Sequence, residues 1–366
     1  MNQPPLAAAL LLALCVPLAG QHNDTAEREI QRHLRDENWA KAQAKLEAWT
    51  AARPDDGRGW FLLAYALGQQ GELKRAVEVG TKAATFAPSR GNALYNVACM
   101  QTRLGELDAA MASLHESRQA GFLDIDLAET DPDLEPLRGR EDFPSPPRLE
   151  YDEFRAPNGV VIGYHVDVPA DYDADSSYPT VVAFAPGNWK RRAADWMRTE
   201  LFGREPNQAG LIVVTVVAPD RGWHTHPAHH ALEALVRRVR RDYAVAPGRI
   251  AAFGLGQGAR PATTYLRMSK RVFDTLITIG TTAWGTWKDT ELARFRDQHI
   301  VEIFGSQDEH AQRQSERIAT VFAESGFDYR QVIVPDSGPT AEGLRGAALL
   351  DLLAAQLRGD APALGR

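Results

Sequence analysis

Four histidines within seven residues are the densest group of metal-binding side chains in this sequence: His224, His226, His229 and His230. They follow a predicted strand at 211–217 and lie at the start of a predicted helix at 228–243. Neutral imidazole nitrogens bind zinc or copper, but a catalytic zinc usually also needs a carboxylate or a further histidine from elsewhere in the chain. Two interpretations stay open: a solvated loop that partly caps the helix and holds no cofactor, or a zinc site.

A sharp turn between a strand and a helix is the second feature with a bearing on chemistry. A predicted strand at 249–253 runs into Gly-Leu-Gly-Gln-Gly at 254–258, and a helical pattern follows. Glycines allow the left-handed backbone and the close backbone approach that such a turn needs, and a turn of this kind exposes its middle residue. That residue is Gly256, which has no side-chain atom that could attack a carbonyl carbon. The pattern therefore predicts a sharp turn without a nucleophile.

Predicted strands alternate with predicted helices from residue 150 to residue 358. Several of the strands are continuous apolar runs, which are typical of strands buried on both faces. The alternation predicts an α/β fold, in which a mainly parallel sheet is covered by helices on both faces. The strands are expected at 160–168, 180–185, 211–217, 249–253, 275–279, 300–304 and 331–334, and the helices at 192–201, 228–243, 311–325 and 341–357.

The order of these motifs resembles the α/β-hydrolase family, and most of all its esterase and peptidase-like branch. The turn at 254–258 stands where that branch commonly has Gly-x-Ser-Gln-Gly around its nucleophile. Ala-Pro-Gly-Asn at 185–188 follows an early strand, where the family has its oxyanion loop, and Gly-Ser-Gln-Asp at 305–308 follows a late strand. The resemblance covers 150–358 and implies ligand contacts from Gly187, Asn188 and Gln257.

Two of the three catalytic positions depart from the family's pattern. Gly256 stands at the position of the nucleophilic serine, and Pro339, after the last predicted strand, stands where the family has its histidine base. No histidine follows His310 in the sequence, and Asp308 remains as a relic of the acid position. Oxyanion-type stabilisation and binding alone would leave about 10³- to 10⁴-fold over the uncatalysed rate. The pattern thus predicts a pseudo-hydrolase that binds a small ligand without turning it over.

The alternative function is an active hydrolase of carboxylic esters or peptides. It would need a displaced serine, for which Ser269 and Ser306 are the candidates, or a metal-assisted site at the four histidines. Ser269 lies a helix away from the turn and Ser306 neighbours the acid, so neither serine fits the chain order of the fold. Lys-Arg-Arg at 190–192 is interpreted either as a solvated face or as an attraction for an anionic ligand beside the cleft.

The region 25–140 carries a helical repeat with a period of 34 residues. Gly-Glu-Leu at 71–73 recurs at 105–107. The spacing of Trp60, Leu63, Ala64, Leu67, Ala76, Gly80 and Ala83 resembles the tetratricopeptide family, and three helical hairpins are predicted at 25–56, 57–90 and 91–124. The resemblance implies either a concave surface for a protein or peptide partner or a structural cap on the next domain.

Composition and charge exclude several classes of function. The 366 residues are 44% apolar and 24% charged, which is ordinary for a globular protein. The net charge of −7 argues against nucleic acid as a partner. Cys15 and Cys99 are too few for a disulfide framework or a thiolate zinc cage.

The chain is expected to be exported and to contain two folded parts. Residues 1–20 are an uncharged segment rich in Leu and Ala, which is typical of a signal peptide; a retained N-terminal anchor is the alternative, because no basic residue precedes it. A proline-rich linker at 141–149 separates the repeats from the α/β domain at 150–358, and a tail covers 359–366. The predicted location is periplasmic or extracellular, with no membrane span after signal removal.

Overall fold

The structure is a computed structural model. It describes residues 25–86, 90–122, 124–186, 190–205, 207–268, 272–280, 298–325, 328–338, 340–341 and 343–359. The chain divides into two compact units, and the division between Pro144 and Ser145 falls inside the predicted linker, while residues 124–126 group with the second unit. No helix in these described ranges is both long enough and apolar enough to cross a membrane.

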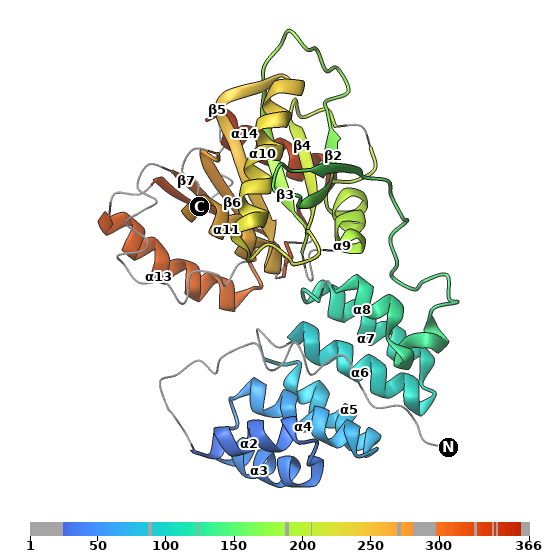
Figure 1. The fold of residues 1–366 in the computed structure, drawn as a ribbon. Helices are drawn as coiled ribbons and strands as arrows, with labels where there is room; N and C mark the ends of the chain where they lie inside the picture. The colour runs from blue at the N-terminus through green and yellow to red at the C-terminus, as the bar shows by residue number, and fades with distance from the viewer. Residues whose placement is uncertain are drawn as a thin grey trace. The chain divides into compact units, whose positions relative to one another are not determined.

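The first unit is built from helices that pair in sequence order (Figure 1). The bounds are α2 (Thr25–Arg35), α3 (Trp39–Ala52), α4 (Gly57–Gln69), α5 (Leu73–Ala83), α6 (Arg90–Leu104), α7 (Leu107–Gln119), α8 (Ile125–Thr130) and the 3₁₀ helix η1 (Pro132–Leu137). Helices α2 and α3, α4 and α5, and α6 and α7 pack as successive hairpins, and η1 packs on α6 and α7. These helix pairs coincide with the three hairpins that the 34-residue period predicts.

The period has a physical origin in the turns within the hairpins. Gly71 and Gly105 have φ angles of 78° and 79°, in the left-handed region that favours glycine. After the first glycine the Glu72 N–H donates to the Leu67 carbonyl at 3.0 Å, and the second turn repeats this bond at 2.9 Å. The repeated Gly-Glu pair therefore ends one helix and starts the next in the same way in both hairpins.

Small residues let neighbouring helices approach closely, as the repeat pattern predicts. Ala64, Ala76 and Ala83 are buried in the core of the first unit. A methyl group added at Gly80 on α5 would lie only 2.7 Å from Cγ2 of Val97 on α6. The packing of α5 against α6 thus depends on the absence of a side chain at position 80.

The second unit contains an eight-stranded sheet in its described part (Figure 1). The strands are β1 (Asp152–Arg155), β2 (Val161–Asp167), β3 (Tyr178–Phe184), β4 (Ile212–Val217), β5 (Val245–Leu255), β6 (Thr275–Ile279), β7 (His299–Gly305) and β8 (Asp328–Val334). Their order is β1-β2-β4-β3-β5-β6-β7-β8. β2 pairs antiparallel with β1 and β4, and every other pairing is parallel.

Helices cover both faces of this sheet. They are α9 (Arg191–Trp196), the π-helical turn η2 (Met197–Leu201), α10 (His226–Asp242), α11 (Ala259–Met268), α13 (Glu309–Ser325) and α14 (Gly346–Arg358). Side chains of α10, α11 and α13 pack on one face, and side chains of η2 and α14 pack on the other. The predicted α/β fold with helices on both faces is confirmed.

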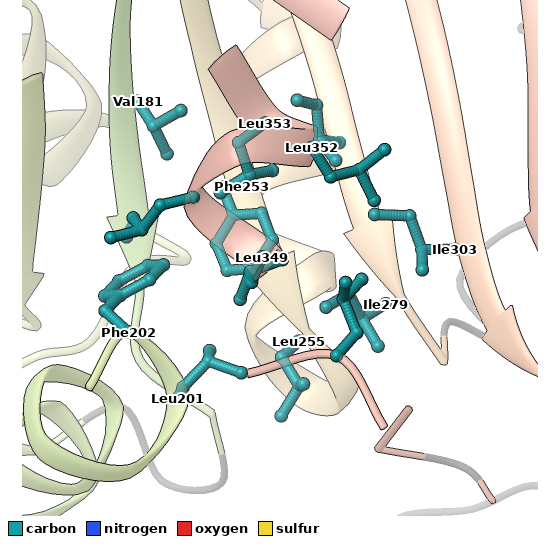
Figure 2. Close-up of a cluster of buried hydrophobic side chains, with 14 of the residues drawn as sticks. Val181, Leu201, Phe202, Phe253, Leu255, Ile279, Ile303, Leu349, Leu352 and Leu353 are labelled. Carbon is teal, nitrogen blue, oxygen red and sulfur yellow. The ribbon is translucent and has the colours of Figure 1, made fainter. Parts of the chain in front are cut away.

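The face beneath α14 shows why the strands are continuous apolar runs. Figure 2 shows Leu349 and Leu353 of α14 packed around Phe253 of β5, with Leu201 of η2 nearby. Phe253 is fully buried. Alternate residues of β5 lie in the core of the opposite face, so both sets of side chains have to be apolar.

Two elements differ from the sequence-based expectation. β1 was not predicted, because three of its four residues are exposed and the strand therefore lacks an apolar pattern. The last helix begins at Gly346 and not at 341, since Ala341 has a φ of 48° and Arg345 has an extended backbone with φ −139° and ψ 162°.

A buried carboxylate beneath α13 makes the stability of the second unit depend on pH. Glu302 on β7 is 1% exposed, and its Oε2 accepts hydrogen bonds from Ser315 at 2.6 Å and from Tyr329 at 2.5 Å. Burial raises the pKa of Glu302 above 4.5 despite these bonds. Because the folded chain binds this proton more tightly than the unfolded chain does, the free energy of unfolding falls as pH rises from 4.5 through the folded-state pKa.

Glu302→Gln should flatten this dependence. The amide keeps a carbonyl oxygen for the two hydroxyl donors but carries no charge, so the variant should lose less stability than the wild type as pH rises above 4.5. Urea unfolding of both proteins across that range measures the difference. Glu309→Gln is the control, because the Glu309 side chain is 80% exposed. Parallel pH profiles for wild type and Glu302→Gln would contradict the assignment.

Candidate functional site

The ends of three neighbouring parallel strands lie level at one edge of the sheet. The backbone register pairs Leu255 of β5 with Ile279 of β6, and Ile279 with Ile303 of β7. Gly256 follows the end of β5 and Asp308 follows the end of β7. Ligands of open α/β sheets bind outside this carboxyl edge. The topology therefore places the predicted nucleophile position and the predicted acid position at the edge where a ligand would bind.

The turn after β5 has the tight geometry that its glycines predict. A methyl group at Gly254 would lie 2.3 Å from the carbonyl oxygen of Gly258, and one at Gly258 would lie 2.5 Å from that of Phe184, at the end of β3. Any side chain at either position would collide with backbone. These two glycines let α11 start directly against β3 and β5.

Gly256 is the exception within this turn. Its φ is +53°, and a methyl group built on it would meet no atom of the described residues within 4 Å. A side chain at this position would therefore project away from the described part of the chain, as a nucleophile at the tip of such a turn must. The turn is intact, and the residue at its tip has no functional group.

Asp308, the predicted relic of the acid position, caps a helix. It is 8% exposed, and its Oδ1 accepts the Ala311 N–H at 3.0 Å in the first turn of α13. Among the described residues, the Asp308 carboxylate takes part in this capping hydrogen bond. A capping role is sufficient to account for an aspartate at this position without any part in catalysis.

The turn after β7 is joined to the loop after β8 by backbone hydrogen bonds. The Ser306 N–H donates to Val334 O at 2.8 Å, the Gln307 N–H donates to Ser337 O at 2.9 Å, and the Asp336 N–H donates to Ser306 Oγ at 2.9 Å. The acid turn and the loop expected to carry the base thus lie side by side. Pro339 itself lies outside the described residues.

The four histidines divide into one buried and three exposed side chains. His229 is 6% exposed, and its Nε2 lies 2.8 Å from the carbonyl oxygen of Trp223, which can only accept a hydrogen bond. Its ring packs edge-on against Tyr265 with the centroids 4.6 Å apart. Burial, followed by the charges of His226 and His230, lowers the pKa of His229. His229 therefore serves as a neutral packing residue that ties α10 to the preceding loop.

The remaining histidines lie at the exposed start of α10. His224, His226 and His230 are exposed, and Thr225 caps the helix by accepting the Ala228 N–H at 3.3 Å. Three ligand atoms within 4.8 Å of one another could hold a metal ion. Among the described residues, one group of His, Cys, Asp or Glu side chains meets this condition, and it contains no histidine. The loop caps the helix through Thr225, and both the absence of a cofactor and a zinc site at the histidines stay predictions.

Three further predicted ligand contacts lie in segments for which side chains are not described. Gly187 and Asn188 lie outside the described residues. The backbone of Gln257 lies in the short 3₁₀ helix η3 (Gly256–Gly258).

Ser269, a candidate displaced nucleophile, lies outside the described residues. Ser306 is described, and its hydroxyl accepts a hydrogen bond from the loop after β8.

Two clusters of charged or ionisable side chains were not anticipated. Arg192, predicted to be solvated or to attract an anion, is 4% exposed and pairs with Asp195 at 2.5 Å. In the first unit, Cys99 lies with Asp131 and Asp133 in a buried group. Spacing along the sequence could suggest the first pair, since the residues are three apart on one helix. No local signal joins Cys99 to residues of another helix.

A short stretch of this chain is similar in sequence to a curated plant protein. No protein-family model matches the chain. It is 39% identical over 61 residues to a chloroplastic protein of Arabidopsis thaliana, and this stretch covers 17% of this chain and 18% of that protein. A match of this extent does not assign a family.

Among solved structures, the similar chains are hydrolases of the α/β type. A thermostable esterase is 17% identical, with a TM-score of 0.42, over 54% of this chain and 58% of its own. An S-formylglutathione hydrolase from Staphylococcus aureus is 10% identical, with a TM-score of 0.43, over 56% of this chain and 97% of its own. A putative dipeptidyl aminopeptidase IV from Bacteroides ovatus is 15% identical, with a TM-score of 0.39, over 60% of this chain and 36% of its own. Sequence identities and TM-scores this low give no basis for assigning the activity of these proteins to this chain.

Proposed function

We propose that this chain is a non-catalytic, hydrolase-like binding protein. The observation that carries the proposal is the state of the turn after β5, where Gly254 and Gly258 keep the tight geometry and Gly256 lacks any reacting atom. None of the described residues fills the space beside Gly256, and a small ligand would lie there against the backbone. Asp308, at the acid position, caps α13. These features support binding at the carboxyl edge of the sheet without covalent catalysis.

Hydrolysis of a panel of activated acyl esters by the full chain tests this proposal. We expect no turnover above the uncatalysed rate, with or without a metal chelator, because the sequence has neither a serine at the tip of the turn nor a histidine after β8. Turnover that the chelator abolishes would favour the alternative, a metal-assisted hydrolase at the four histidines. Turnover that resists the chelator would mean that a serine elsewhere serves as the nucleophile.

Restoring a serine at the tip of the turn should not restore activity. The first side-chain carbon of Gly256→Ser would meet no atom of the described residues within 4 Å, and the left-handed backbone costs about 1 to 2 kcal/mol for a non-glycine residue. Without a base the serine stays protonated and weakly nucleophilic. A fluorophosphonate probe, which labels activated serines, should therefore leave both wild type and Gly256→Ser unlabelled. Labelling of Gly256→Ser alone would show that a base is present after all.

The helical hairpins are proposed to resemble tetratricopeptide units and to bind a protein or peptide. Their paired helices and the repeated turns at Gly71 and Gly105 support this interpretation.

We further propose that the chain is exported to the periplasm or the extracellular space and that residues 1–20 are removed as a signal peptide. N-terminal sequencing of the mature protein tests this: a start near Gln21 supports export, and an intact first segment contradicts cleavage.

A further inference from the structure

A buried cluster in the first unit brings a thiol and two carboxylates together. Cys99 lies on α6, Asp131 immediately precedes η1, and Asp133 lies in its first turn. One ligand atom of each residue lies within 4.8 Å of the other two, and Cys99 Sγ is 3.8 Å from Asp131 Oδ2. Sulfur and oxygen ligands of a tetrahedral zinc lie about 3.5 Å apart. The spacing of Cys99 and Asp131 is therefore close to that of zinc ligands, and the ligand atom of Asp133 lies within 4.8 Å of both.

The Asp133 carboxylate is the part of this cluster that its neighbours leave unsatisfied. Its exposed fraction is 9%, and its Oδ2 is buried with no hydrogen-bond partner among the described residues. Arg103 attracts it, but burial and the charge of Asp131 outweigh that attraction and raise the pKa of Asp133 to about 6. Buried carboxylates are normally hydrogen-bonded, paired or bound to a metal ion.

The Asp131 carboxylate, in contrast to that of Asp133, accepts a hydrogen bond at each of its oxygens. Its Oδ2 accepts the Tyr95 hydroxyl at 2.7 Å, and its Oδ1 accepts the Asp133 N–H at 3.0 Å. Arg138 also donates to the Asp131 backbone carbonyl. These contacts fix the position of one carboxylate beside Cys99, while the second carboxylate lies in the same cluster with an unused oxygen.

We propose that Cys99, Asp131 and Asp133 form a divalent metal site that prefers zinc. Zinc accepts thiolate and carboxylate ligands together, whereas calcium and magnesium take oxygen ligands. Binding converts the Cys99 thiol to a thiolate and releases its proton to solvent. Each aspartate supplies one oxygen, and three protein ligands leave one position for water. A bound cation would also relieve the repulsion between the two carboxylates.

Tyr95 is the positioning residue of this site. Its hydroxyl orients the Asp131 carboxylate from outside the group of three ligand residues. Removing such an outer hydrogen bond typically lowers metal affinity about 10- to 100-fold. Tyr95→Phe should therefore weaken zinc binding by about that factor while the bond between metal and sulfur persists.

Cobalt(II) titration of the full chain tests the thiolate contact. A cysteine thiolate bound to cobalt gives an intense charge-transfer band in the near ultraviolet, which histidine ligands do not give, so cobalt at the four histidines would not interfere. We expect the band in the wild type, in the Cys15→Ser control and in Tyr95→Phe, and its loss in Cys99→Ser. Zinc should displace the cobalt and remove the band, and the displacement gives the zinc affinity.

Asp133→Asn provides a second test that keeps the thiol and the side-chain shape. Zinc affinity should fall about 100-fold or more in this variant, with circular dichroism unchanged. The proposal is overturned if the wild type gives no charge-transfer band, if the band survives in Cys99→Ser, or if folded Asp133→Asn binds zinc as tightly as the wild type. None of these outcomes bears on the proposed binding at the carboxyl edge of the sheet, because the cluster lies in the first unit and the sheet lies in the second.

Discussion

Gly305→Ala is expected to destabilise the second unit by about 3 kcal/mol or more. A methyl group at Gly305 would lie 1.9 Å from the carbonyl oxygen of Ser337 and 2.3 Å from that of Gly338. Both obstacles are backbone atoms, so no side-chain rotation relieves the collision. Relief requires the loop after β8 to move away and to lose the bond from the Gln307 N–H to Ser337 O. Thermal unfolding of the full chain, followed by circular dichroism, measures the loss.

Gly256→Ala is the matched control for this prediction. It adds the same methyl group at another strand end, where no atom of the described residues lies within 4 Å of it. Its cost is limited to the left-handed backbone, about 1 to 2 kcal/mol. The midpoint for Gly305→Ala should therefore lie several degrees below that for Gly256→Ala, since about 2 to 4 °C correspond to each kcal/mol in a domain of this size. Equal midpoints would contradict the close packing of the two loops.

Asp195→Ala should cost about 3 to 5 kcal/mol, because it leaves a buried arginine without its counter-charge. Arg192 and Asp195 are 5% and 1% exposed at their side chains and lie 2.5 Å apart. Arg192 also donates to the backbone carbonyl oxygens of Pro146 and Pro147. The ion pair thus holds the chain that enters the second unit against α9. Its loss should lower the midpoint of thermal or urea unfolding.

An exposed ion pair of the same unit supplies the comparison. Glu309 and Arg313 lie 3.1 Å apart on α13, with side chains 80% and 66% exposed. Glu309→Ala removes a carboxylate as Asp195→Ala does, but solvent already screens the pair, so the expected cost is below about 0.5 kcal/mol. If Asp195→Ala were as mild as Glu309→Ala, the Arg192 guanidinium would have to reach solvent in the folded protein.

These effects bear on the proposed function because they distinguish the residues that maintain the backbone geometry of the sheet edge from the position that would carry a reactive group. The residues that shape the sheet edge, such as Gly254, Gly258 and Gly305, tolerate no side chain, whereas a side chain at Gly256 would meet none of the described residues. The geometry around Gly256 is therefore maintained by packing. A binding protein needs that geometry to hold a ligand, and it needs no reactive group at the tip.

The layers of both units could be predicted from sequence because they depend on residue type and period. The continuous apolar run at β3 predicts a doubly buried strand, and the 34-residue spacing of Gly71 and Gly105 predicts repeated hairpins. β1 lacked such a pattern, since its residues are mostly exposed. The predicted start of α14 at 341 was wrong, because an alanine in the sequence does not indicate the left-handed backbone that Ala341 adopts.

The sequence by itself determined the alternation of strands and helices after β1, the tight glycine turn after β5 and the absence of a nucleophile at Gly256, all of which follow from local residue type. Only the tertiary structure decided which side chains meet. It buried His229 apart from its exposed neighbours, and it brought Cys99 to Asp131 from another element. The physical reason is that spacing along a chain sets neither the direction of a side chain nor its partner on a distant segment; packing sets both.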